Sequence, residues 1–291
     1  MKIIYKIPGY ILCLLGGFFL SWGGLIIRSF DTTDTWKILT IRSFFFIIAL
    51  IIFLVLTYKK NTIKIIKNSG IPAIIAGLFL SLSFVAYIVA MSKTSVANVV
   101  FIISTQTIFL AVFGFLFLKE KINFRGFISI ALAFVGLAVM LGNSINQGTL
   151  FGNIVAFAIP INFTILVMII RKFPNLDMVP AIFYSGLFSG LYGIILASDL
   201  SFSPNDILMG FFLGVPQLAF GFICVTIGSK TTPAVTVGLL MLLETIFAPI
   251  WVWIFLNEVP PISVFVGGAI IISAVILKSF NKYDKINNLN N

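Results

Sequence analysis

One acidic side chain, Glu244, lies deep inside a long apolar stretch of this chain. The stretch covers residues 233–256, and Glu244 is about eleven residues along it, which is roughly 16 Å for a helix. If that helix crosses a bilayer, the carboxyl group is near the midplane, where an ionisable group costs about 3 kcal/mol or more and by default marks a functional site. Two functional interpretations are open: Glu244 binds and releases a proton, or it pairs with an amine of a ligand. The structural alternatives are a neutral acid hydrogen-bonded between helices and a fixed ion pair with Arg42.

A second polar group, Gln106, occupies the equivalent place in an earlier segment. When residues 92–120 are aligned with residues 229–258, Gln106 falls opposite Glu244. At about 100° per residue, Gln106 shares a narrow polar stripe of a mainly apolar helix with Ser95, Asn98 and Thr105. We expect this stripe to face either a polar cavity or a neighbouring helix. In the second case each interhelical hydrogen bond contributes only about 0.6 kcal/mol.

Two further side chains could bind a polar ligand. Arg42 is about six residues into the apolar run 36–57, so it could hold a carboxylate or phosphate with two parallel hydrogen bonds. It could equally extend to the membrane interface as a structural anchor. Gln217 follows Pro216 and shares one side of its predicted helix with several glycines, which permit close helix packing and would direct Gln217 into the bundle.

Four more residues are candidates by position alone: Trp22, Tyr87, Asn162 and Tyr184. With aromatic residues at 15% of the chain, packing is an equally good explanation for each aromatic member of this group. We predict no catalytic residue, no metal site and no cofactor. The chain has no histidine, which removes the common nucleophile pairs and histidine-bearing zinc motifs, and it has no nucleotide-binding loop. An enzyme is therefore not expected.

The elements that must position these residues are long apolar helices. The chain is 60% hydrophobic and 10% charged, whereas soluble domains carry about 25% charged residues. A helix needs about 17–25 apolar residues to cross a membrane. We therefore predict an all-α polytopic membrane protein with ten transmembrane helices, at about residues 9–28, 36–57, 71–91, 95–118, 124–142, 150–171, 178–198, 206–229, 233–256 and 262–280.

The basic residues are distributed according to membrane topology. The connection 58–70 is rich in lysine, whereas its counterpart 199–205 in the second half has Asp199 and no base. Likewise 119–125 is basic and 257–261 is not. Because basic loops stay on the cytoplasmic side, this pattern places both termini in the cytoplasm. We expect the protein to be integral to a bacterial inner (plasma) membrane. The net charge of +10 therefore reports topology, and no nucleic-acid partner is expected.

The chain repeats itself. Ser92-Lys93-Thr94 recurs as Ser229-Lys230-Thr231, and the first repeat is assigned to residues 1–142 and the second to residues 150–280, with a cytoplasmic tail at 281–291. Because each repeat holds five predicted helices, an odd number, the second must be inserted upside down relative to the first. Inverted repeats of this kind are common in carriers that bind their substrate near the midplane, where the halves meet.

Several short motifs resemble the EamA-type branch of the drug/metabolite transporter superfamily along nearly the whole chain. They are Ser21-Trp22-Gly23, Arg42, the segment Ala90–Ala97, Phe-Leu-Lys-Glu at 117–120, Phe-Leu-Asn-Glu at 255–258, Gly126 and Gly136. The resemblance implies ten helices, termini on the cytoplasmic side and carriage of small metabolites or amino acids, often as exporters.

We therefore predict a secondary active transporter, an exporter, of a small polar metabolite such as an amino acid or related amine, working by alternating access. Glu244 would bind the coupling proton or the substrate amine, Gln106 would supply hydrogen bonds and Arg42 would meet a carboxylate. The partners expected are a small-molecule substrate, the lipid bilayer and a coupling proton, and dimerisation is left open. The alternative is a non-transporting membrane scaffold or lipid-binding protein.

Overall fold

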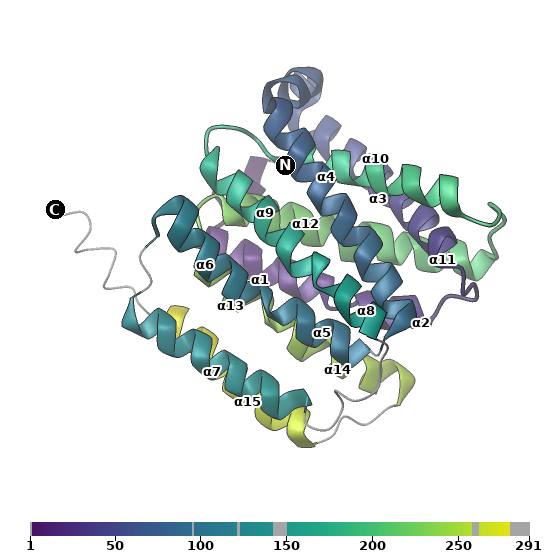
Figure 1. Cartoon of the computed structure of the whole chain (residues 1–291). Helices are drawn as coiled ribbons and strands as arrows, with labels where there is room; N and C mark the ends of the chain where they lie inside the picture. The colour runs from purple at the N-terminus through teal and green to yellow at the C-terminus, as the bar shows by residue number, and fades with distance from the viewer. Residues whose placement is uncertain (1, 95, 121–122, 142–149, 258–261, 280–291) are drawn as a thin grey trace.

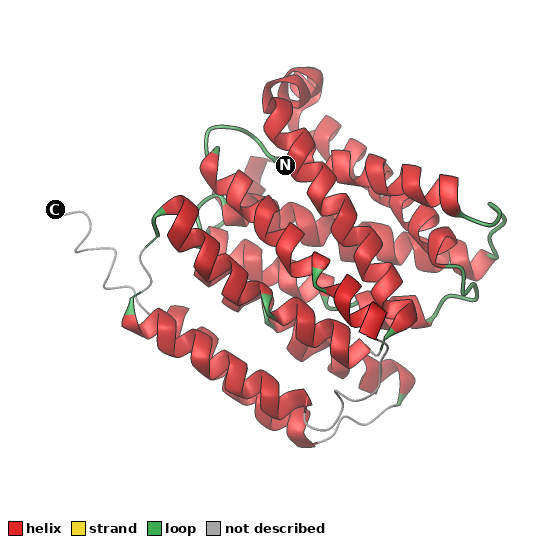
Figure 2. Ribbon diagram, in the orientation of Figure 1, coloured by secondary structure: helices red, strands yellow, loops and turns green. Residues whose placement is uncertain are grey.

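The computed structural model describes residues 2–94, 96–120, 123–141, 150–257 and 262–279. Within these ranges every regular element is a helix (Figure 2). The helices that cover the predicted apolar runs are α1 (Gly9–Leu20), α2 (Gly23–Arg28), α3 (Thr35–Tyr58), α4 (Thr62–Lys93), α5 (Val96–Ser104), α6 (Gln106–Leu118), α7 (Phe124–Leu141), α8 (Leu150–Ala156), α9 (Ala158–Lys172), α10 (Val179–Leu196), α11 (Pro204–Phe212), the π-helix η4 (Leu213–Phe220), α12 (Gly221–Ser229), α13 (Ala234–Met241), α14 (Leu243–Leu256) and α15 (Ile262–Ser279). Short 3₁₀ turns precede α1 and α4, at Lys2–Lys6 and Lys59–Asn61.

The all-helical membrane fold is confirmed. In the described part of the chain, six helical stretches are long and apolar enough to cross a membrane, and one of them, Thr35–Lys93, holds two predicted runs. Shorter apolar helices lie at Ile102–Leu118, Phe124–Val139 and Phe265–Leu277. That all ten runs cross the membrane stays a prediction. Helix α4 starts at Thr62, before the predicted run 71–91. The chain turns at Gly70, where φ is +56°, so α4 joins a short helical segment before this glycine to the predicted run after it.

Equivalent helices of the two halves pack against each other in opposite directions. Between α3 and α10, Gly186 lies against Phe46 and Gly193 lies against Thr40, so residue numbers rise on one helix as they fall on the other. Between α6 and α13, Gly114 lies against Ala234 and Gly238 lies against Thr107, which is the same antiparallel order. Helix α7 lies beside α15 (Figure 1). This arrangement is the one that an inverted duplication predicts.

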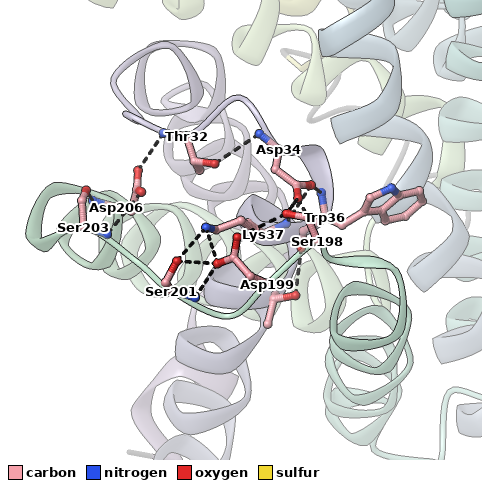
Figure 3. A network of polar contacts seen from close by, with 10 residues as sticks. Thr32, Asp34, Trp36, Lys37, Ser198, Asp199, Ser201, Ser203 and Asp206 are labelled. Carbon is pink, nitrogen blue, oxygen red and sulfur yellow. Dashed lines mark hydrogen bonds and ion pairs between the residues drawn. The ribbon is translucent and has the colours of Figure 1, made fainter.

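One end of the bundle, which we call the acidic end, holds residues 29–37 and 197–206. Asp34 caps α3 by accepting hydrogen bonds from the backbone of Trp36 and Lys37, and the Lys37 ammonium lies 2.8 Å from the Asp199 carboxylate (Figure 3). Hydrogen bonds from Lys37 and from Ser201 hold the pKa of Asp199 below its usual range. Asp206 accepts from the backbone of the α2–α3 loop and joins it to α11. The acidic end is thus a continuous polar network between the two halves.

The opposite end, which we call the basic end, is tied by Arg171. Its guanidinium forms an ion pair with Glu120, which follows α6, and donates to the carbonyls of Ser229 and Thr232. The Glu120 carboxylate also accepts from the backbone N–H of Ala234, the first residue of α13, at 2.9 Å. Four helix ends from both halves are therefore joined by one half-buried ion pair.

Candidate functional site

Four helical runs are interrupted midway, at the junctions α1/α2, α5/α6, α8/α9 and α13/α14. At each junction one backbone N–H bonds the carbonyl three residues earlier, as in a 3₁₀ turn: Trp22 to Phe19, Thr105 to Ile102, Phe157 to Ile154, and Leu242 to Leu239. Interrupted helices at a repeat interface are typical of binding sites in carriers, because they leave backbone groups and helix ends free to meet a ligand.

Proline explains part of this pattern. Pro160 has no N–H to give the Ala156 carbonyl, and α8 ends at Ala156. The junctions at Trp22 and Thr105 have no nearby proline, so the first half is interrupted without one. Helix α14 continues through Pro249.

A cavity of about 60 Å³ lies between the two halves. Since about 10–15 Å³ is enough for one water molecule, this cavity has room for several. Its wall is mostly leucine, isoleucine and phenylalanine. Its polar lining residues are Arg42, Ser83, Tyr87, Gln106, Gln217 and Glu244.

Arg42 lies in this cavity wall and is 1% exposed. Its guanidinium stacks over the Phe84 ring, 5.1 Å from the ring centroid, and one Nη donates to the Phe84 carbonyl at 3.5 Å. Its Nε has no hydrogen-bond partner, and no acidic side chain in the described ranges forms an ion pair with it. The structure therefore contradicts two of the alternatives left open by the sequence, an interfacial anchor and a fixed ion pair with Glu244.

Glu244 and Gln106 occupy equivalent places on opposite sides of the interface. Gln106 is the first residue of α6, and Glu244 is in the first turn of α14, so each directly follows a helix junction. Beside them, Ser104 and Thr245 join the halves through a hydroxyl–hydroxyl hydrogen bond of 2.9 Å. The free N–H groups at the start of a helix favour a negative charge, which suits an acidic residue in this turn.

Gln217 is held by η4. Pro216 cannot donate to the Phe212 carbonyl, so α11 ends at Phe212 and the chain continues as a π-helix. The Gln217 Nε2 donates to the carbonyl of Leu20, the last residue of α1, at 3.1 Å. Its Oε1 is buried and has no hydrogen-bond partner among the residues that the structure describes.

The remaining predicted residues lie elsewhere, except Tyr87, which lines the cavity. Trp22 faces a separate apolar pocket of about 430 Å³, with Trp251 among its neighbours. Asn162 is buried in α9 and Tyr184 packs against Gly77 of α4, and neither is among the cavity-lining residues. A substrate-binding role for these residues stays a prediction, because helix position alone does not say which neighbour a face meets.

Two residues of the predicted polar stripe lie in a segment that the structure describes only in part. Asn98 belongs to α5, but its side chain is outside the described part, and so is Ser95. Ser83 is a lining residue that the sequence analysis missed. The signal was available: Ser83 and Tyr87 are four residues apart and so share one face of α4.

Comparisons with known proteins agree with this architecture. The family model described as "EamA-like transporter family" matches residues 7–142 and 150–280. A protein of Clostridium kluyveri named "Uncharacterized transporter" is 26% identical, covering 94% of each chain. A Rickettsia bellii protein named "S-adenosylmethionine uptake transporter" is 26% identical and covers 81% of this chain and 80% of its own length.

A solved crystal structure superposes with a TM-score of 0.79 at 15% sequence identity, covering 93% of this chain and 96% of the other. At that identity the similarity concerns the fold alone.

Proposed function

This chain belongs to the EamA-like transporter family, and from this we propose that it is a secondary active transporter of a small polar metabolite, of the amino acid or related amine class. A small-molecule substrate and embedding in a membrane follow from the family. The substrate class, the direction and the mechanism are our proposal.

One observation carries the proposal: the cavity between the halves is lined by one basic and one acidic side chain that form no ion pair with each other. Arg42 is buried and has no acidic partner among the described residues, and Glu244 lines the same cavity. A guanidinium can bind a carboxylate through two parallel hydrogen bonds, and a carboxylate can bind an ammonium group. A zwitterionic ligand with both groups would satisfy both side chains at once.

Glu244 also suits a coupling role. A proton and a substrate ammonium group would compete for the Glu244 carboxylate. Because binding of one would release the other, this competition would couple proton transport to substrate transport. We propose that the inverted halves open this site to each side of the membrane in turn, with ten helices crossing and both termini in the cytoplasm.

The resemblance favours export. The Rickettsia bellii relative is named as an uptake transporter for S-adenosylmethionine, which is itself an α-amino acid. S-adenosylmethionine therefore belongs in the substrate panel, and both directions must be measured.

The test is counterflow and efflux in proteoliposomes with amino acids, S-adenosylmethionine, polyamines and nucleosides. We expect at least one amino acid or amine to exchange above the level of protein-free liposomes, and Glu244→Gln to lose the pH dependence of that exchange. Asp199→Asn, the same acid-to-amide change at the acidic end, is the matched control and should transport as wild type. No exchange of any panel member by the wild type contradicts the proposed function. Normal, equally pH-dependent transport by Glu244→Gln contradicts the role given to that carboxylate.

A further inference from the structure

The orientation of the Gln217 amide is fixed by its surroundings. The Leu20 carbonyl, 3.1 Å away, is an acceptor, so the amide must present its N–H₂ group to it. Gln217 is 4% exposed and η4 holds its backbone, so the amide has one settled position. With the nitrogen committed, Oε1 is the end of the amide left without a partner, in a residue that lines the cavity.

An acceptor that is buried without a partner needs an explanation, because nearly all buried polar groups in native proteins are hydrogen-bonded. No donor in the described ranges reaches Oε1. Since Gln217 lines the same cavity as Arg42 and Glu244, the donor that it lacks can come from a molecule in that cavity.

Gly23 keeps the space in which this amide lies. A Cβ atom at Gly23 would be 2.7 Å from the Tyr87 hydroxyl and 3.0 Å from the Gln217 Nε2. Both side chains therefore converge on the start of α2, and any larger residue at Gly23 would displace one or both of them. The helix junction between α1 and α2 thus supplies both the carbonyl that orients Gln217 and the gap that admits it.

From these contacts we infer that Gln217 is a specificity-determining residue, whose Oε1 accepts a hydrogen bond from an N–H group of the transported molecule, and that Gly23 is a positioning residue for it. This inference rests on the proposed function and narrows it. The transported molecule must keep at least one N–H on its amine, so a fully N-methylated analogue with the same carboxylate and the same charge is rejected. A site built to accept a hydrogen bond discriminates strongly against analogues that lack the donor.

The experiment uses the full-length protein in proteoliposomes and compares glycine, alanine, methionine and phenylalanine, each with its N,N,N-trimethylated form, as competitors and as counterflow substrates. For the wild type we expect each free amine to act at concentrations at least about tenfold lower than its trimethylated form. Gln217→Met is expected to lose most of this difference, because it removes the acceptor. Gln217→Glu is the conservative variant: a neutral carboxyl group can donate its O–H to the Leu20 carbonyl and still present an acceptor, so the difference should return. Thermal unfolding of each variant separates loss of recognition from loss of folding.

The outcomes are distinct. If free amines and trimethylated forms act equally on the wild type, or if folded Gln217→Met discriminates as the wild type does, the inference about Gln217 is wrong while the transporter proposal stands. If Gly23→Ala leaves the discrimination unchanged, Gly23 has no positioning role. If neither class of compound moves through the wild type, the amino acid and amine class is wrong, and the inference fails with it.

Discussion

Replacing Arg42 by methionine should make the protein more stable and, at the same time, inactive. Arg42 is 1% exposed and has no carboxylate partner among the described residues, so the protein holds a nearly unpaired cation in its interior. A group kept for substrate binding commonly lowers the stability of the empty protein. A charge that is balanced by an ion-pair partner behaves differently, because its removal leaves the partner buried and unpaired and so lowers stability.

The expected size follows from the contacts of Arg42. Moving one ion out of water costs several kcal/mol even after relaxation of the protein. Two contacts offset part of this cost: stacking over Phe84, about 2 kcal/mol when desolvated, and the long 3.5 Å hydrogen bond to the Phe84 carbonyl, about 1 kcal/mol. A methionine of similar length keeps the apolar packing. We therefore expect the free energy of unfolding to rise by about 1–2 kcal/mol, which corresponds to roughly 2–8 °C in melting temperature.

The assay is thermal unfolding of the purified protein in detergent without substrate, together with counterflow in proteoliposomes. Arg42→Lys is the matched control. It keeps the charge, so its melting temperature should not rise, but it loses the planar pair of donors that fits a carboxylate, so its transport should fall.

A drop of about 3–5 kcal/mol in the stability of Arg42→Met would refute the reasoning, because that is the cost of removing one member of a balanced buried ion pair. Stability gained together with normal transport would show that Arg42 does not contact the substrate.

Three further predictions concern the ends and the packing of the bundle. Arg171→Met leaves Glu120 without its ion-pair partner, so the free energy of unfolding should fall by about 2–4 kcal/mol, and an unchanged thermal unfolding curve would contradict this. The pKa of Asp199 is lowered in the folded protein by its lysine partner, so its contribution to stability is present above the unfolded pKa of about 4 and is lost as the pH falls towards the folded value. Unfolding curves measured below about pH 4 should therefore lose less stability in Asp199→Asn than in wild type. Gly214→Ala places a Cβ 2.5 Å from a backbone carbonyl of α3 and should cost about 1–3 kcal/mol, whereas Gly190→Ala, whose Cβ meets nothing closer than 3.4 Å, should be tolerated in the same unfolding assay.

The sequence was sufficient for the all-helical fold and for its duplication, but it did not predict all four helix junctions. Helix formation in a membrane is a local matter, because each segment must satisfy its own backbone hydrogen bonds, so a long apolar run predicts a helix directly. The all-helical fold and the resemblance to EamA-type transporters are confirmed by the structure and by the family match. The alignment of Gln106 with Glu244 could also be read from the sequence, and both residues line one cavity.

What only the tertiary structure decided is which faces of these helices meet. In lipid the acyl chains are as apolar as leucine, so an apolar face does not reveal whether it packs against protein or against lipid. For that reason Trp22 and Tyr184 were as good candidates as Tyr87 from the sequence, and only Tyr87 lines the cavity. The bond from Gln217 to the Leu20 carbonyl spans 197 positions and depends on a π-helix in one half and a helix junction in the other. No local pattern encodes such a contact, because it exists only after the two halves have packed.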